Sequence, residues 1–395
     1  MANALCLDIT RTVSRLGRGH ATGIDRVEQA YLTHLLSAPR PLFLLLRTDW
    51  GLILFGPENA TAVHDYLAEA TSAGSSGKGR AIKARAEAFV RRKAVARAPR
   101  FLARHMFRRH VPPGTTLLNV GHANLDRTVL AGWRSVPSSR VAVMLHDTIP
   151  LDFPDFQRKG SAARFAQTLS VIARFADCVL TPSKAAGAAA RRWFPITGNL
   201  PEIHVAPLGI DIAKPDQSAL PSDLTLKQPY FVTVGTIEPR KNHALLLKVW
   251  RDFPTKMRPQ LLIIGRRGWR NERVFNALDQ GKSDDIVECA DLCDSAVSYL
   301  LTHCAGALFP SFAEGYGLAP IEAACLGAPL ICADLAVTRE TLGNIPVYVD
   351  PSDVYLWRQN IIRLAAKNRA GRDSWRVLKA PPTWEAHFNQ VMSLL

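Results

Sequence analysis

The sequence predicts an α/β protein that contains two doubly wound domains. Short apolar runs ending at Gly, Pro or a polar residue alternate with helical patterns along the chain, as in parallel sheets covered by crossover helices. The 395 residues fit two domains, because one domain commonly takes roughly 100 to 200 residues. A stretch rich in Pro, Asp and Ser without apolar period covers 209–229 and reads as a linker. We therefore expect one domain over 1–208 and another over 230–382.

The apolar runs give the expected strands of each domain in order. In the first domain they are Leu5–Asp8, Pro41–Leu46, Thr116–Val120, Arg140–His146 and Cys178–Thr181. In the second they are Tyr230–Gly235, Leu261–Gly265, Ala305–Pro310 and Leu330–Cys332, separated by helices expected over Ala244–Arg251, Ser295–His303 and Pro320–Leu326. Ligands of such sheets bind at the carboxyl ends of strands. Functional residues are therefore expected in the loops that follow strands.

Composition narrows the class of partner and the compartment. Forty-nine Lys and Arg against 34 Asp and Glu give a formal charge of +15, which favours an anionic partner. The seven cysteines are scattered without a CxxC pair, which fits a reducing compartment. Asp8 and Arg11 interrupt the start of the chain where a signal peptide needs an apolar stretch. We expect a cytoplasmic protein that spans no membrane.

One strongly basic segment, Lys78 to Arg109, interrupts the alternating pattern. It carries twelve Lys and Arg against one acidic residue, with apolar residues at roughly helical spacing. Such a stretch suits an anionic membrane surface, where each cation contributes about 1 kcal/mol. A solvated helix with its apolar face on the core is the main alternative. Nucleic acid is not expected, since no aromatic stacking platform or recognition motif accompanies the charge.

The segment with the most chemical information is 309–334, FPSFAEGYGLAPIEAACLGAPLICAD. A strand is followed by a loop with Glu314, Gly315 and Gly317, and then by a helix with Glu322 in its expected first turn. Glycines let the backbone approach a bound group, and a helix start offers N–H donors to phosphate. Carboxylates beside an anion site repel it unless they accept hydrogen bonds from sugar hydroxyls. The pattern indicates a site for a phosphorylated sugar.

The spacing of these two carboxylates resembles a known family. E-x7-E within PSxxEGYGLxxxE is similar to the donor site of retaining glycosyltransferases of the GT-B fold, glycosyltransferase family 4. The resemblance implies two Rossmann-like domains facing across a cleft. It also covers the segments VGTIEPRKN (234–242), IIGRRGW (263–269), TGIDRVE (22–28), HD (146–147), PLGID (207–211) and TWEAHFNQVMSLL (383–395). The last resembles the family's final helix, which crosses back onto the amino-terminal domain.

The resemblance assigns the donor-binding residues. Glu322 would bind the ribose diol, and Glu314 would bind hydroxyls of the transferred sugar. Arg240 and Lys241 would stabilise the charge on the leaving diphosphate, which fixed cations in a dry cleft can do. Many family members have Arg at the position of Thr236, so Arg240 would substitute for it. The other expected donor-binding residues, several of them through main-chain N–H groups, are Gly235, Thr236, Gly315, Tyr316, Gly317 and Leu318.

The first domain would supply the acceptor side. Gly23, Asp25 and Arg26 follow the first strand, where the family places a glycine-containing loop near the donor phosphates and the acceptor. A simple strand-to-helix turn is the alternative. His146 ends an apolar run, and by the resemblance it would hydrogen-bond the transferred sugar. A histidine at a strand end can also be purely structural.

We expect no metal and no other cofactor. The sequence has no Asp-x-Asp after a strand and no His/Cys cluster with metal spacing. The expected activity is retaining, metal-independent transfer of a hexose from a nucleotide-sugar to a saccharide acceptor. The basic segment leads us to expect that this acceptor is lipid-linked. The segments TGIDRVE and HDTIP resemble those of bacterial mannosyl- and rhamnosyltransferases of polysaccharide assembly, so GDP-mannose is the first choice of donor. Rhamnosyl or glucosyl transfer from dTDP- or UDP-sugars is the alternative. The expected setting is cell-surface polysaccharide biosynthesis on the inner face of the membrane.

Two functions of other classes stay open from the sequence. A sugar-nucleotide epimerase shares the same architecture. A non-catalytic basic protein could use the charge for nucleic acid and would then bind with a steep salt dependence.

Overall fold

The amino-terminal half forms an eight-stranded sheet. In this computed structural model, residues 3–16, 23–73, 88–89, 92–122, 125–194, 200–254, 257–281, 284–368 and 376–395 are described. The strands are β1 (Leu5–Asp8), β2 (Leu42–Thr48), β3 (Gly51–Phe55), β4 (Ala96–Ala98), β5 (Thr116–Asn119), β6 (Arg140–Met144), β7 (Cys178–Thr181) and β8 (Glu202–Val205). Their order is β4-β3-β2-β1-β5-β6-β7-β8. All neighbours pair in parallel except β3, which is antiparallel to both β2 and β4.

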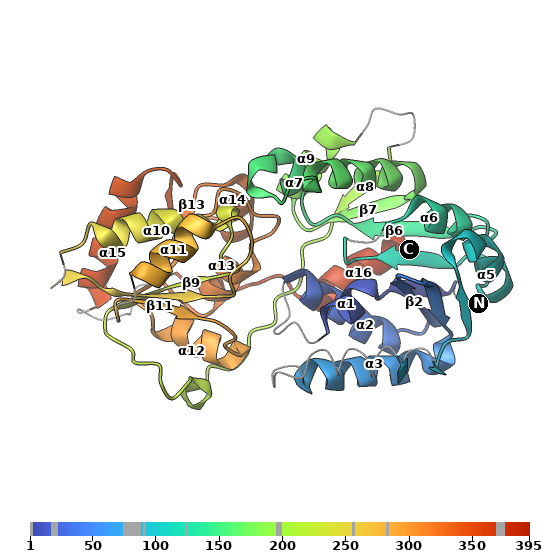
Figure 1. The fold of residues 1–395 in the computed structure, drawn as a ribbon, viewed down its shortest axis with the longest axis horizontal. Coiled ribbons are helices and arrows are strands. Elements are labelled where there is room, and N and C mark those ends of the chain that lie inside the picture. Colours follow the sequence, from blue (N-terminus) through green and yellow to red (C-terminus); the bar gives the residue numbers. More distant parts are fainter. Residues whose placement is uncertain are drawn as a thin grey trace.

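Helices cover both faces of this sheet (Figure 1). They are α1 (Thr10–Arg15), α2 (Gly23–Ser37), α3 (Pro57–Ala73), η2 (Arg100–Leu102), α5 (Ala103–His110), α6 (Arg127–Trp133), α7 (Ile149–Asp152), η3 (Pro154–Phe156), α8 (Ser161–Phe175) and α9 (Lys184–Trp193). Because both faces are covered, central strands such as β1 are buried along their whole length and read as unbroken apolar runs.

The carboxyl-terminal half repeats this architecture with six parallel strands. They are β9 (Tyr230–Val234), β10 (Gln260–Ile264), β11 (Ile286–Cys289), β12 (Gly306–Phe309), β13 (Leu330–Ala333) and β14 (Val347–Val349), in the order β11-β10-β9-β12-β13-β14. The helical elements are η4 (Gln217–Ala219), η5 (Pro239–Lys241), α10 (His243–Arg251), α11 (Glu272–Gln280), α12 (Asp294–His303), α13 (Leu318–Cys325), α14 (Ala336–Leu342), α15 (Val354–Asn368) and α16 (Trp384–Leu394). The expected α/β class with two sheets is confirmed, and Figure 1 shows the two lobes side by side.

The last helix, α16, packs on the amino-terminal lobe, where Figure 1 places it among elements from the start of the chain. His387 lies 2.8 Å from the Tyr31 hydroxyl, and Phe388 stacks on His34 at 3.8 Å. The chain passes between the lobes twice, once at 209–211 and once just before α16. The two connections touch, because Trp384 Nε1 donates to Asp211. A Cβ at Gly209 would lie 2.3 Å from the Trp384 nitrogen. The two crossings are therefore packed backbone against backbone.

In the described part of the basic segment, some apolar side chains are buried in the core and others are exposed to solvent. Residues 74–87 and 90–91, which include Lys78, lie outside the described residues. On α5, Met106 and Phe107 are buried in the core, and Phe107 packs edge-on against Trp133. Phe101 and Leu102 on η2 are instead exposed. The core-packing alternative is thus correct for α5 but does not account for η2.

In the described ranges, no helix is both long enough and apolar enough to cross a bilayer.

Candidate functional site

Two strand ends of the carboxyl-terminal sheet prepare the site. Gly235 follows β9 with a φ of 145°, and Gly265 follows β10 with a φ of 154°; L side chains rarely adopt such values. A Cβ at Gly265 would lie 2.1 Å from the Gly235 carbonyl oxygen. A Cβ at Gly235 would lie 3.2 Å from Cε of Lys241. The absent side chains let the two loops meet and let Lys241 extend across the end of β9.

A buried charged cluster centres on Glu314, in the loop between β12 and α13. Its Oε1 accepts from Lys241 Nζ at 2.5 Å and from the Ser311 hydroxyl at 2.7 Å. Its Oε2 accepts from Arg240 at 2.8 Å, and Arg240 also donates to the Ala313 carbonyl at 3.0 Å. A carboxylate has about four acceptor positions, so one is still available. The expected meeting of Glu314, Arg240 and Lys241 is observed.

The two cations determine the protonation of this cluster. Burial works against the charge of Glu314, but the neighbouring Lys241 and Arg240 lower its pKa to about 2. Burial raises the pKa of Glu238, although Arg240 binds that carboxylate at 2.7 Å and opposes the change. Oε2 of Glu238 is buried without a hydrogen-bond partner. Arg240 therefore lies between two carboxylates and is fixed in place by both.

The amino-terminal domain faces this cluster with the end of β6. Burial, followed by the nearby His122, lowers the pKa of His146 to about 4, so its ring is neutral near pH 7. Its Nε2 lies 2.7 Å from the Val120 carbonyl. A Cβ at Gly315 would lie only 2.5 Å from the His146 carbonyl oxygen. Burial raises the pKa of Asp147, while Arg240 of the other domain opposes this rise. The main chain of His146 thus meets the loop that carries Glu314 across the two domains, while its ring is bonded within its own domain.

Glu322 lies in a second contact between the domains. Arg26 on α2 donates to Glu322 at 2.9 Å and also forms an ion pair with Asp294 at the start of α12. Burial raises the pKa of Glu322, and Arg26 opposes that rise. Beside this pair, a Cβ at Gly23 would lie 3.0 Å from Cδ1 of Leu318. The structure therefore brings the predicted acceptor loop against the predicted ribose-binding residue.

The helix carrying Glu322 begins earlier than the sequence predicts. Gly317, with a φ of 87°, is the N-cap residue, and α13 starts at Leu318 rather than at Pro320. Glu322 is consequently the fifth residue of the helix and lies beyond its first turn. The expectation of an acidic residue in the first turn is wrong. A simple helix-start role for Glu322 is correspondingly weakened, since the helix dipole acts mainly within that turn.

Other predicted residues have partners within the protein. Asp25 is buried and binds Arg11 and Arg15 of α1 at 2.7 and 3.3 Å. The Tyr316 hydroxyl donates to the Leu208 carbonyl at 3.0 Å, so this side chain is bonded within the protein. Thr236 packs near Gly268, whose Cβ would lie 2.8 Å from the threonine methyl. Ligand contacts by these residues stay predictions.

Sequence reasoning missed several residues that shape the site. Ser311 and Glu238 bind the charged cluster directly, and His122 contributes a second buried neutral imidazole whose Nε2 has no partner. Burial lowers the pKa of His122 to about 4. Ser183 donates to the Gly315 carbonyl at 3.0 Å. Their common signal is position, because each lies in a loop after a parallel strand.

Among the described residues, no group of three or more His, Cys, Asp or Glu side chains is arranged to hold a metal ion.

The family comparison matches a part of the chain that carries this cluster. Residues 218–373 match the family model described as "Glycosyl transferases group 1". Over these residues the chain is similar to that family. This confirms the resemblance drawn from the E-x7-E segment, which falls within the matched residues.

The chain is also similar to individual proteins, in sequence or in fold. O-antigen chain mannosyltransferase B of Escherichia coli is 31% identical over 152 residues, which are 38% of this chain and 39% of that protein. The chain thus spans about two fifths of the length of this relative. Sucrose-phosphate synthase from Thermosynechococcus elongatus has a TM-score of 0.60 at 15% identity, covering 99% and 98% of the two chains. HepE from Anabaena, in complex with UDP, has a TM-score of 0.55 at 14% identity and covers both chains fully. These similarities establish the GT-B fold.

Proposed function

We propose that this protein is a glycosyltransferase of bacterial polysaccharide biosynthesis that moves a hexose from a nucleotide-sugar to a saccharide acceptor. The observation that carries the proposal is the buried cluster of Arg240, Lys241 and Glu314 at the ends of parallel strands, facing His146 of the other domain. The region similar to the glycosyl transferases group 1 family includes this cluster. Both support nucleotide-sugar chemistry at this place.

The cluster is suited to a diphosphate leaving group. As the glycosidic C–O bond breaks, negative charge builds up on the phosphate oxygens, and Lys241 and Arg240 are already held in position by Glu314. Preorganised cations in a water-poor site stabilise such charge without reorganising. The remaining acceptor position of Glu314 would take a hydroxyl of the transferred sugar. One residue then both orients the sugar and positions the cations.

The ribose would bind at Glu322 in place of Arg26. In this structure Arg26 donates to the carboxylate that the proposal assigns to the ribose diol. Donor binding therefore exchanges an ion pair between domains for hydrogen bonds to ribose. The freed guanidinium, part of the amino-terminal domain, lies where the diphosphate or acceptor would arrive.

We propose a retaining, metal-independent front-face transfer. The acceptor hydroxyl oxygen bonds to the anomeric carbon on the face from which the diphosphate departs, and a phosphate oxygen takes the hydroxyl proton. The products are the new glycoside and the nucleoside diphosphate. Neutral His146 would hydrogen-bond the transferred sugar, and fixed cations would do the work of a divalent ion.

GDP-mannose is the proposed donor, in agreement with the mannosyltransferase relative. UDP- and dTDP-sugars are the alternatives, and HepE of the same fold binds UDP. The proposed acceptor is a lipid-linked saccharide at the inner membrane surface, which would account for the basic residues before Arg109.

A thermal-shift panel of GDP-, UDP- and dTDP-sugars tests the donor, because a ligand that binds the folded state raises the melting temperature. Glu322→Ala is expected to weaken nucleotide-sugar binding, and Lys241→Ala to lower turnover while binding changes less. Glu288→Ala, a change on β11 away from the cluster, is the control. Wild-type binding and turnover in both site variants would refute the assignment. Formation of an epimer without acceptor would select an epimerase instead.

A further inference from the structure

We propose that the exposed side chains of Trp50, Phe101 and Leu102 form an apolar tip that inserts into an anionic phospholipid surface. Membrane binding itself does not depend on the proposed function. Only the biological reason for it, access to a membrane-bound acceptor, rests on that function. Trp50 is 85% exposed, Phe101 77% and Leu102 45%. Trp50 lies outside the basic segment and was not expected to belong to the same surface.

Strand pairing brings these residues to one corner of the amino-terminal sheet. Trp50 lies in the tight turn between β2 and β3, and Leu52 of β3 pairs with Ala98 of β4. A Cβ at Gly51 would lie 2.3 Å from the Ala98 carbonyl oxygen. The turn that carries Trp50 is therefore in backbone contact with the segment that leads directly into Phe101.

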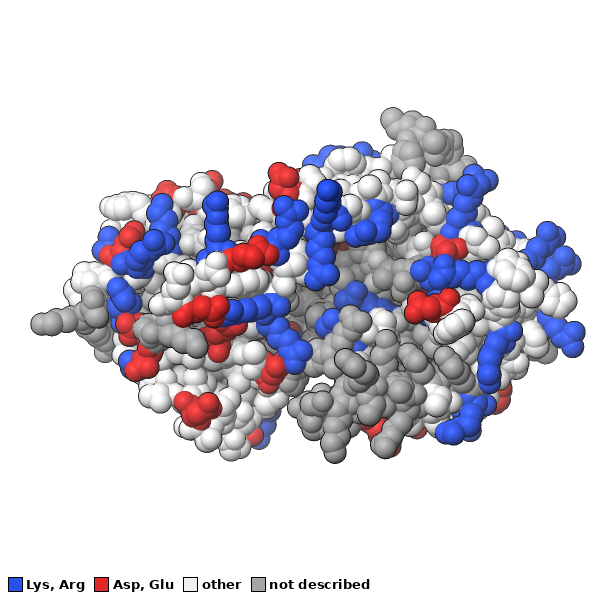
Figure 2. Space-filling model, viewed as in Figure 1, with Lys and Arg blue, Asp and Glu red and all other residues white. Residues whose placement is uncertain are grey.

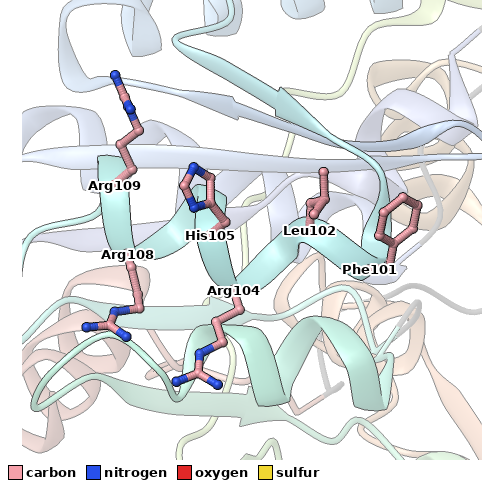
Figure 3. A pocket seen from close by; sticks show the side chains of 6 residues that line it. All are labelled: Phe101, Leu102, Arg104, His105, Arg108 and Arg109. Atoms are coloured by element: carbon pink, nitrogen blue, oxygen red, sulfur yellow. The ribbon is translucent and has the colours of Figure 1, made fainter.

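A basic stripe, defined as Arg100, Arg104, His105, Arg108 and Arg109, runs beside the apolar tip. Phe101, Leu102 and the last four of these line one surface hollow of about 540 Å³. In Figure 3, Arg104 and Arg108 point the same way from α5, while Phe101 and Leu102 project from the preceding turn. Residues 92–109 contain seven Lys and Arg and no Asp or Glu. Figure 2 shows basic side chains projecting from the rim where Figure 1 places α5.

This combination favours lipid over nucleic acid. Aromatic and aliphatic side chains beside Arg are typical of surfaces that bind at the headgroup boundary, where apolar atoms enter the acyl region and cations meet phosphate. A duplex backbone would meet the cations but leave Trp50 and Phe101 without an apolar environment. Met106 and Phe107 are not available to either partner, because they are buried in the core.

The apolar tip lies at the sheet edge that bears the acceptor-facing residues. The turn holding Trp50 joins the carboxyl end of β2, and β1 and β2 run parallel. Asp8, the last residue of β1, pairs with Leu45 of β2, and β2 continues for three residues before the turn, about 10 Å at roughly 3.3 Å per residue. Asp126 bridges the two regions, with Arg100 at 3.6 Å and Arg47 of β2 at 3.8 Å. Insertion of the tip would therefore hold this edge close to the bilayer.

Vesicle flotation of the full chain tests the proposal, with phosphatidylcholine alone and with added phosphatidylglycerol. Wild type should bind the anionic vesicles in a salt-sensitive way. The double variant Trp50→Ala, Phe101→Ala should bind at least about tenfold more weakly, whereas Trp50→Phe should retain most binding. Tyr355→Ala is the matched control, because this exposed aromatic lies on α15 of the other domain.

The charge arm uses Arg104→Ser with Arg108→Ser. Each lost arginine should reduce affinity for anionic vesicles about fivefold. Lys248→Ser with Arg251→Ser, two exposed positions on α10, should leave it unchanged. All variants change exposed side chains, and unchanged melting temperatures would exclude unfolding as the cause of lost binding.

Three outcomes would overturn the proposal. In the first, neither double variant changes vesicle binding. In the second, the wild type binds equally well to vesicles without anionic lipid. In the third, the double variants lose affinity for DNA but keep their affinity for vesicles. The melting-temperature shift produced by GDP and UDP is measured on the same variants. That shift reports the donor site and should stay at its wild-type value, so failure of docking and failure of the proposed transferase function are distinguishable.

Discussion

At the scale of single residues, Glu314 contributes to the charge balance of the cluster that is proposed to bind the donor. Its single negative charge offsets part of the charge of Lys241 and Arg240, and these two cations keep Glu314 ionised by lowering its pKa to about 2. A carboxylate in this position limits how strongly the cations hold a diphosphate. The same residue is proposed to accept a sugar hydroxyl, so binding of the leaving group and orientation of the sugar are coupled through it.

Glu314→Gln should therefore separate product affinity from turnover. The amide keeps the size of the side chain but leaves the two cations less neutralised, so GDP or UDP should bind more tightly and give a larger melting-temperature shift. Transfer should slow by roughly 100-fold, a usual effect of losing one preorganised contact. Calorimetric nucleoside diphosphate affinity and kcat provide the measurements. Glu288→Gln, at an ion pair of β11 with Arg267, should change neither quantity.

Glu28 gives a second prediction, concerning stability and pH. It is almost fully buried, accepts from the Thr12 amide at 2.7 Å, and burial raises its pKa to about 8. A raised folded-state pKa contributes stability that is present below the unfolded value of about 4.5 and is lost as the pH rises through about 8. Between those values the folded state binds one extra proton. Its share of the unfolding free energy should fall by about 1.4 kcal/mol per pH unit.

Glu28→Gln should remove this slope. Urea unfolding of wild type and variant across about pH 5 to 8 measures the difference, and the difference cancels contributions from the buried histidines, which act in both proteins. Parallel pH profiles for the two proteins would show that Glu28 is ionised in the folded state over the whole range.

At the scale of elements, the start of α13 should depend on the left-handed conformation of Gly317. Gly317→Ala places a Cβ at a φ of 87°, 3.2 Å from Cγ of Pro320, and should cost about 1–2 kcal/mol of stability. It should also weaken nucleotide binding, since the first N–H groups of α13 shift. Gly343→Ala, at a φ of 55° with nothing within 4 Å of the added Cβ, is the matched control. It should reduce stability without weakening nucleotide binding, as measured by denaturation and by GDP or UDP titration.

The sequence predicts strands better than helix starts and edges. β1 and β7 have the predicted limits because both are short apolar runs bounded by polar residues. Five strands, β3, β4, β8, β11 and β14, were not predicted, and the last three are short and partly exposed. β3 follows β2 after a two-residue turn within one nearly continuous apolar stretch, and β4 has only three residues in the basic segment. The start of α13 was misplaced because a proline suggested the first helical position, whereas a glycine three residues earlier in the chain forms the cap.

At the scale of the whole molecule, contacts between the two domains decide which residues of the amino-terminal domain lie at the candidate site. The apolar runs placed Glu314, Arg240 and Lys241 in loops after strands, and the family resemblance assigned them to one site. Neither predicted that Arg26 binds Glu322, 296 residues further along. That contact requires the relative placement of two domains, which no periodicity encodes. Trp269 Nε1, which donates to the Phe156 carbonyl at 3.0 Å, is a second such case.

Glu340 tests whether these contacts hold the domains closed. From α14 of the carboxyl-terminal domain, its carboxylate accepts from the main-chain nitrogens of Lys184 and Ala185 at 2.7 and 3.0 Å. These are the first N–H groups of α9 in the other domain, and a carboxylate at a helix start contributes roughly 0.3–1 kcal/mol. Glu340→Ala should shift the equilibrium toward an open form by up to about fivefold.

Small-angle scattering of the nucleotide-free protein should then give a larger radius of gyration for Glu340→Ala than for wild type. Adding the donor nucleotide should restore part of the difference, because a ligand bound by both domains favours closure. Glu272→Ala is the control, since Glu272 is also acidic in the first turn of a helix but belongs to α11 within one domain. An equal radius for Glu340→Ala and wild type would mean that the packing of Gly315 on His146 and the Arg26 ion pairs keep the domains together without this helix cap.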